Sequence, residues 1–214
     1  MTTDWRAAPD FGLTQLTRRF HQDWTREGTV LEIVASSADS FGGKAAPALL
    51  EDSLRLLESP LPTWAVTSLW LAATCRGYDI DRLGVDGRDW LRQIIDVCLQ
   101  RLRKDDPAYH PPAPAPPSES LTGEVLDEIL LVTPQLPVAI TEHAWARVGG
   151  VVPALNMAAT QAGPDLAFRL LLRCLSEYWV PLTQPQYDRF AALGERFGYG
   201  EPLVMAVDHL IDLE

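Results

Sequence analysis

Hydrophobic side chains recur along the first half of the chain at the three- and four-residue spacing of amphipathic helices. Four runs show this spacing most clearly: Leu13, Leu16, Phe20 and Trp24; Leu50, Leu54 and Leu57; Val66, Leu69, Trp70 and Ala73; and Trp90, Leu91, Ile94, Ile95, Cys98 and Leu102. A tryptophan within such a run is expected in the core, because the apolar stripe already accounts for it. No convincing strand pattern occurs, so we expect about five helices here.

Local signals mark the ends of these helices. Thr29 and Glu32 have the spacing of a capping box directly after Gly28, so we expect the first helix to end near Gly28 and the next to begin at once. A Ser-Pro-Leu-Pro segment at 59–62 separates two later runs. Asp86 is placed to cap the last helix of this half.

The second half shows the same helical spacing and one ambiguous region. Helices are predicted around four runs: Val125, Leu126, Ile129 and Leu130; Leu166, Leu170, Leu171, Cys174 and Tyr178; Tyr187, Phe190, Leu193 and Phe197; and Leu203, Ala206, Val207 and Leu210 in a closing helix over 202–213. Thr183 and Gln186 form a second capping-box pattern. Residues 131–160 permit loops or short strands. The fold class predicted from both halves is all-α.

A proline-rich segment separates the halves. Six of the 17 prolines lie between Pro107 and Pro117, and this composition favours an extended, semi-rigid chain over a helix. We therefore expect two helical domains or subdomains, residues 1–104 and 121–214, joined by a linker over 105–120.

Acidic residues are concentrated in the second half. The chain has 18 Lys and Arg against 29 Asp and Glu, a net charge of −11. Before residue 105 there are 13 basic and 14 acidic residues, whereas the rest of the chain has 5 and 15. This charge repels phosphate backbones and anionic lipid heads, so neither nucleic acid nor membrane is expected as a direct ligand.

Several features predict a cytoplasmic location. The first residues lack the basic start and apolar run of a secretory signal. The longest near-apolar stretch, 64–73, has about half the roughly 20 residues of a membrane-spanning helix. Cys75, Cys98 and Cys174 are widely spaced within apolar helical patterns, which is typical of buried structural thiols in a reducing compartment.

Motifs for catalysis or metal binding are incomplete. Gly42-Gly43-Lys44 lacks the first glycine and the Ser or Thr of a phosphate loop, and the acidic turn beginning at Asp79 lacks two oxygen ligands of a calcium loop. The histidines are far apart and have no metal-ligand spacing: His21, His110, His143 and His209. We expect a binding protein without metal or cofactor. A catalytic site assembled from distant residues around His143 or His209 is the alternative.

Three short motifs follow one another in the first half: Phe20-His21-Gln22-Asp23-Trp24, Gly77-Tyr78 and Asp89-Trp90-Leu91. In this order they resemble the immunity proteins of bacterial contact-dependent growth inhibition systems, whose small helical domain has a His-Gln-Asp-Trp signature near its first helix and a Trp-Leu at the start of its last. The resemblance covers roughly residues 11–103. It departs in the proline- and tryptophan-rich stretch 59–74, and residues 118–214 have no such resemblance.

The resemblance implies a protein that binds a cognate bacterial toxin tightly and covers its active site or an adjacent surface. Many such toxins are nucleases with basic grooves, which an acidic protein approaches by complementary electrostatics. The residues proposed for partner contact are His21, Asp23, Trp24, Glu124, Asp127 and Glu128.

Each of these residues also has a structural interpretation. His21 lies near the end of the first helix, where positive charge is favoured, and Trp24 completes an apolar stripe, so the tetrapeptide can stabilise the fold instead of touching a toxin. The acids at 124–128 can form a solvated helix face. The alternative function is a cytoplasmic helical scaffold or regulatory interaction module without a toxin partner. Self-association is left open.

Overall fold

The computed structural model describes residues 10–113, 119–199 and 201–212, and these residues form α-helices and short 3-10 turns. The first half contains α1 (Gly12–Arg18), η2 (Trp24–Arg26), α2 (Val30–Asp39), α3 (Ala46–Glu58), α4 (Thr63–Ala73), η3 (Asp81–Leu83) and α5 (Gly87–Asp105). The second half contains η4 (Glu119–Leu121), α6 (Thr122–Val132), α7 (Leu136–Glu142), α8 (Val151–Gln161), α9 (Pro164–Glu177), α10 (Gln184–Arg196), α11 (Glu201–Val204) and η5 (Met205–Leu210). The predicted all-α class is confirmed.

Helix starts follow the predicted local signals. The side chain of Thr29 accepts from the Glu32 N–H, and the Glu32 carboxylate accepts from the Thr29 N–H at 2.7 Å. The capping box of α10 forms in the same way. Asp86 caps α5 by accepting from the Asp89 N–H at 2.8 Å. These contacts satisfy N–H groups that have no partner inside the helix.

Two predicted helices are shorter than expected. α1 ends at Arg18 instead of near Gly28, because the N–H of Arg19 bonds three residues back to Leu16 at 3.0 Å and tightens the last turn. The predicted closing helix over 202–213 is a four-residue α-helix followed by a 3-10 turn. There the chain turns to form an isolated parallel bridge with the segment before α10.

The ambiguous region 131–160 forms two helices, α7 and α8, rather than strands. Pro137 and Pro153 both lie in the first turn of their helix. A proline is tolerated there because the first N–H groups of a helix have no partner within it.

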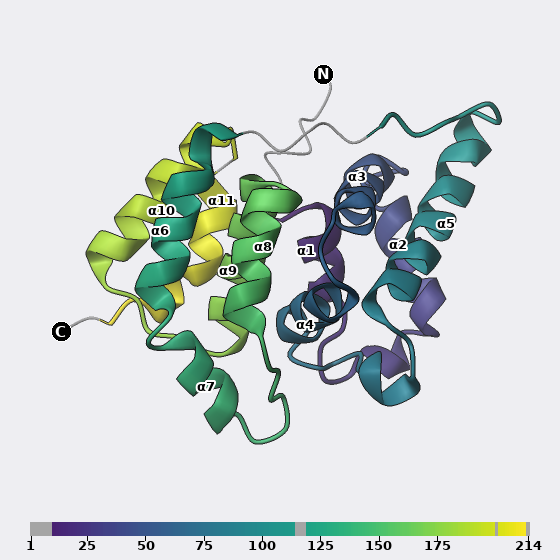
Figure 1. Ribbon diagram of the computed structural model, residues 1–214. Coiled ribbons are helices and arrows are strands. Elements are labelled where there is room, and N and C mark those ends of the chain that lie inside the picture. Colours follow the sequence, from purple (N-terminus) through teal and green to yellow (C-terminus); the bar gives the residue numbers. More distant parts are fainter. Residues whose placement is uncertain (1–9, 114–118, 200, 213–214) are drawn as a thin grey trace.

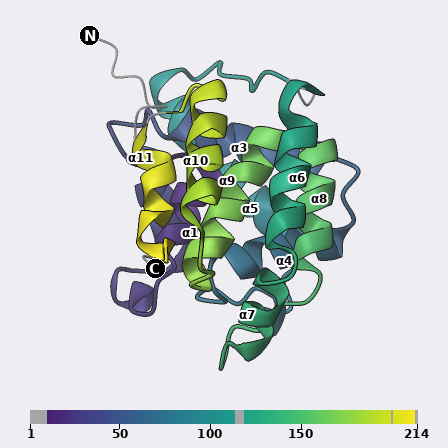
Figure 2. The same ribbon diagram turned by 90° about the vertical axis from the view of Figure 1, so that its left-hand side faces the viewer.

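The two halves lie side by side and share one hydrophobic core (Figure 1). α4 packs against α8 and α9, and α1 also contacts α9. Buried side chains of both halves belong to one continuous cluster. Figure 2 shows α6, α10 and α11 as the outer layer of the second half.

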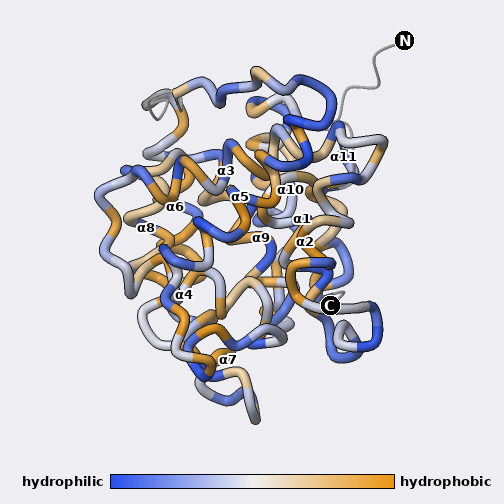
Figure 3. Tube along the Cα trace, turned by 90° about the vertical axis from the view of Figure 1, so that its right-hand side faces the viewer, coloured by the Kyte–Doolittle hydropathy of each residue, from blue (hydrophilic) through white to orange (hydrophobic). Residues whose placement is uncertain are grey.

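Hydropathy along the chain follows this packing. Hydrophobic and hydrophilic positions alternate along the helices (Figure 3), as expected when each helix turns one face to a core. In the described part of the chain, no helix combines the length and apolar composition needed to cross a lipid bilayer.

The predicted linker is only partly described. Residues 106–113 are non-helical, and residues 114–118 lie outside the described residues. Tyr109 packs against the core and, with Pro47 and Leu54 of α3, lines an apolar cleft. The division into two domains stays a prediction, although each half supplies buried side chains to the common core.

Candidate functional site

The tryptophan of the His-Gln-Asp-Trp motif contacts the second motif, Gly77-Tyr78. Trp24 lies on η2, where its Nε1–H donates to the Gly77 carbonyl at 2.7 Å. Its ring packs edge-to-face on Phe20 and Tyr78, with centroids 5.3 and 5.7 Å away. Trp24 therefore acts first as a structural contact within the fold.

All three motifs meet in one aromatic cluster, made of Phe20, Trp24, Trp70, Tyr78 and Trp90. Tyr78 and Trp90 have ring centroids 5.0 Å apart, and Trp70 and Trp90 5.1 Å. Such edge-to-face pairs stabilise a core beyond the burial of their area.

Gly77 is required beside this cluster. A Cβ added at Gly77 would lie 1.8 Å from the carbonyl oxygen of Phe20. The close approach of the two backbones thus leaves no room for a side chain. The three motifs, although far apart in sequence, therefore share one structural role: their residues pack together in this cluster.

His21 and Asp23 remain on the surface. His21 Nε2 lies 2.8 Å from a Glu27 carboxylate oxygen, and Arg19 lies 2.7 Å from the other oxygen. Hydrogen bonds from Arg19 and His21 lower the pKa of Glu27. The Asp23 carboxylate lies 3.3 Å from Arg26. Both predicted contact residues are exposed, but each already has an intramolecular partner.

The three predicted acids of α6 line one groove between α6 and α10, with a cavity volume of about 310 Å³. Glu128 is buried and paired with Arg189, and Glu124 pairs with Arg196. Asp127 is exposed and has no ion-pair partner among the described residues. Glu128 consequently holds α10 against α6 and does not present a free carboxylate to a partner.

The outer layer around this groove carries uncompensated negative charge. Seven described acids of the second half are exposed and have no cationic group within ion-pair distance in the described part of the chain: Asp127, Glu142, Asp188, Glu195, Glu201, Asp208 and Asp212. Both lysines of the protein, Lys44 and Lys104, belong to the first half. The predicted charge asymmetry is thus found in exposed acids of α6, α10, α11, η5 and the residues after η5, with Glu142 apart on α7.

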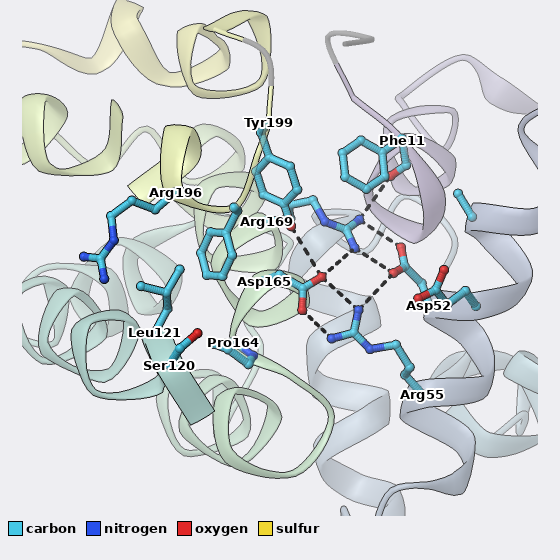
Figure 4. Close-up of a pocket in the computed structure, with 13 residues that line it drawn as sticks. Phe11, Asp52, Arg55, Ser120, Leu121, Pro164, Asp165, Arg169, Arg196 and Tyr199 are labelled. Carbon is cyan, nitrogen blue, oxygen red and sulfur yellow. Dashed lines mark hydrogen bonds and ion pairs between the residues drawn. The ribbon is translucent and has the colours of Figure 1, made fainter. Parts of the chain in front are cut away.

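A second site lies between the halves (Figure 4), at a cavity of about 290 Å³ between α3 and α9. Arg169 of α9 donates to both carboxylate oxygens of Asp52 of α3, at 2.8 and 2.6 Å. Arg55 donates in a bidentate manner to Asp165, at 2.8 Å for one bond. The buried Asp52 also accepts the Leu13 N–H at 2.9 Å. The hydrophobic periodicity of the sequence could not predict these ion pairs, because more than a hundred positions separate the partners.

The four charges of this network neutralise one another. Burial by itself raises the pKa of the Asp165 carboxyl, but the hydrogen bonds and charge of Arg55, together with Arg169, hold it at about 2. The Arg169 guanidinium also lies 4.3 Å from the ring centroid of Phe11. This arrangement fixes α3 against α9.

His143, around which a catalytic site was the alternative, lies beside a cysteine. His143 Nε2 lies 3.6 Å from the Cys75 Sγ. The Ala146 N–H donates to His143 Nδ1 at 3.2 Å, so in the neutral ring the proton sits on Nε2. Nε2 then cannot accept the thiol proton. Burial, aided by the Glu177 carboxylate, raises the pKa of Cys75 to about 11. The pair lacks the features of an activated nucleophile.

Two tryptophans outside the periodic runs are largely exposed. Trp145 is 76 % and Trp179 is 71 % exposed. Trp145 packs on His143, and Trp179 packs on His209 with centroids 5.2 Å apart. Large exposed aromatic side chains are the residues that most often anchor protein interfaces. Sequence spacing missed them because both lie in loops at helix ends.

Comparison with known proteins gives no relative: no protein-family model, curated protein or solved structure matches the chain.

Proposed function

We propose that this protein is an immunity protein that binds a cognate bacterial contact-dependent toxin, such as a nuclease, and blocks its active site or an adjacent basic surface. The order of the three motifs, which build one aromatic cluster, supports the likeness to that family. The fold offers a helical body in which buried ion pairs such as Asp52 with Arg169 join the two halves, as suits a protein that acts by covering a partner with a preformed surface.

The observation that carries this proposal is the set of seven exposed acids without an ion-pair partner, six of which lie on α6, α10, α11, η5 or directly after η5. A basic active-site groove would be attracted to this surface before contact, which raises the association rate and selects against acidic partners. Of the ion-paired acids described in the second half, Glu124, Glu128 and Asp165 pair with arginines of another helix and Glu177 pairs within α9, whereas the unpaired acids face solvent.

Affinity purification of the tagged full chain from its own cells, with mass spectrometry after a moderate-salt wash, tests the proposal. We expect the C-terminal part of a large secreted protein in equal amount, encoded beside this gene. Recovery of housekeeping proteins alone, while the neighbouring toxin is expressed, contradicts it and favours the helical scaffold.

The contribution of the acids on α6 and α10 can be measured as a change in the association rate of the recovered complex. The triple variant Glu124→Gln/Asp127→Asn/Glu195→Gln should lower the association rate about tenfold at low salt, because it removes three exposed negative charges from α6 and α10. The matched control Glu51→Gln/Glu58→Gln/Asp96→Asn removes three exposed acids of the first half. Equal association rates for both triple variants would contradict the electrostatic mechanism.

A further inference from the structure

The groove between α6 and α10, which lie side by side in Figure 1, is crossed by two ion pairs. Arg189 reaches the Glu128 carboxylate at 2.5 Å, and Arg196 binds the carboxylate of Glu124. Because the later arginine pairs with the earlier acid, the two helices run in opposite directions. The cavity of about 310 Å³ is lined by these four residues together with Asp127, Leu131, Ala192 and Leu193.

Asp127 differs from the other two acids of the groove in its surroundings. Its side chain is exposed, and no cationic group of the described residues lies within ion-pair distance of it. Asp127 lies between the two paired acids along α6, and Ala192 lies between the two paired arginines along α10. The antiparallel arrangement therefore places Asp127 and Ala192 between the two ion pairs, on facing walls of one groove.

The arginines of α10 are not available to neutralise Asp127. If Arg189 turned toward Asp127, the carboxylate of Glu128, which is only 5 % exposed, would be left buried without its cation. The walls beside Asp127 are apolar, since Leu131 is 50 % exposed and Ala192 is exposed as well. Such a wall suits the methylene stem of a long basic side chain whose charged end binds a carboxylate.

We propose that the groove between α6 and α10 receives an arginine side chain of the toxin, with its stem on Leu131 and Ala192 and its guanidinium on Asp127. This inference rests on the proposed function, since it names the group of the toxin that the groove binds. Three carboxylates and two guanidinium groups line the groove, so one added arginine balances these charges. Arginine suits the position better than lysine, because its guanidinium is more weakly hydrated and binds a carboxylate through two parallel hydrogen bonds.

Nuclear magnetic resonance titration of the full chain with N-acetyl-argininamide at low salt tests the groove without the toxin. The amide signals of Asp127, Leu131 and Ala192 should shift together and saturate. Asp127→Asn should weaken binding about fivefold, because the charged hydrogen bonds are lost, and Ala192→Leu should weaken it about as much by filling the groove. Glu195→Gln, which removes an exposed acid of α10 outside the groove lining, is the matched control and should stay within about twofold.

Equal affinities of Asp127→Asn and Glu195→Gln, or no saturable shift at the groove of the wild type, would overturn the arginine site. Ala192→Arg adds a test on the complex, because it supplies the cation from α10 itself and should weaken toxin binding about tenfold. The two proposals fail separately. If the wild type recovers the toxin and Asp127→Asn and Ala192→Arg bind it as tightly, the arginine site is wrong and the immunity function stands. If the wild type recovers no toxin, the immunity function fails, and the titration still decides whether the groove binds an arginine side chain.

Discussion

The guanidinium of Arg169 and the carboxylate of Asp52 form a bidentate ion pair in the interior, and each side chain comes from a different half of the chain. The pair is enclosed by the first turn of α1, because Arg169 also donates to the Phe11 carbonyl at 3.2 Å. One buried contact thus connects α1, α3 and α9.

Removing one member of this pair should destabilise the protein strongly. Arg169→Met removes both hydrogen bonds that Arg169 donates to the buried Asp52 and leaves that carboxylate only the longer 3.9 Å contact with Arg55, so we expect a loss of about 3 kcal/mol in the free energy of unfolding. The double variant Asp52→Leu/Arg169→Met should recover part of this loss, because no buried carboxylate is left. The recovery is incomplete because the Leu13 N–H loses the carboxylate to which it donates. Chemical denaturation measures all three proteins.

The control for this prediction is Arg92→Met, which breaks an exposed pair with Asp89 on α5. Its cost should stay below about 1 kcal/mol. Similar costs for Arg92→Met and Arg169→Met would show that burial of the pair has no special effect.

Acid should weaken the second ion pair of the network. The pKa of Asp165 is lowered from 3.8 in the free group to about 2 in the fold, so its stabilising effect is complete above pH of about 4 and is lost as the pH falls toward 2. The shift corresponds to about 2 kcal/mol. Unfolding free energies of Asp165→Asn should therefore depend less on pH in this window than those of the wild type. Asp127→Asn, which removes an unpaired exposed carboxylate, should keep the wild-type slope, and equal slopes for both variants would refute the assignment.

Gly77 should not tolerate a side chain. Gly77→Ala forces its Cβ against the Phe20 carbonyl oxygen and should cost about 1–3 kcal/mol of unfolding free energy. Trp24→Phe, which removes the hydrogen bond to Gly77 and shortens the ring that packs on Phe20 and Tyr78, should cost at least about 1 kcal/mol. Gly123→Ala on α6 is the control, because open space surrounds that position and alanine favours a helix. Thermal unfolding of the three variants compares them, and a neutral Gly77→Ala would contradict the packing argument.

Cys75 should react slowly with thiol reagents. Burial and Glu177 keep its pKa at about 11, so little thiolate is present at pH 8, and Cys98 and Cys174 are fully buried. Labelling with a disulfide reagent should be slow for the folded protein and fast for all three thiols in guanidinium. Labelling of Cys75 as fast as a free thiol would support the catalytic alternative around His143.

Helix boundaries that depend on adjacent residues were predictable. The capping residues Thr29, Asp86 and Thr183 work through contacts three positions away, so their sequence patterns contain the whole interaction. The contact that Trp24 makes with Gly77, 53 positions away, is not encoded by any local pattern, so the sequence did not indicate that Trp24 lies on a separate short turn beyond the end of α1.

The part of the candidate site that depends on residues close in sequence was also predictable. Glu124, Asp127 and Glu128 lie on one turn, so their clustering follows from helical spacing. The partners Arg189 and Arg196, which neutralise two of them, come from a different helix. Trp179 lies just outside the apolar run that ends at Tyr178, so periodicity made no prediction about its exposure.

The common core has a consequence for how this protein can be divided. Residues 11–103 contain every residue of the family likeness, yet the faces of α1 and α4 that meet α8 and α9 would be uncovered in a fragment of that length. Asp52 and Arg55 would also lose Arg169 and Asp165. We expect such a fragment to aggregate, and a chain cleaved between 105 and 120 to stay together as a complex of two pieces. Any transfer of the proposed toxin-binding activity to another host protein should therefore move both halves together.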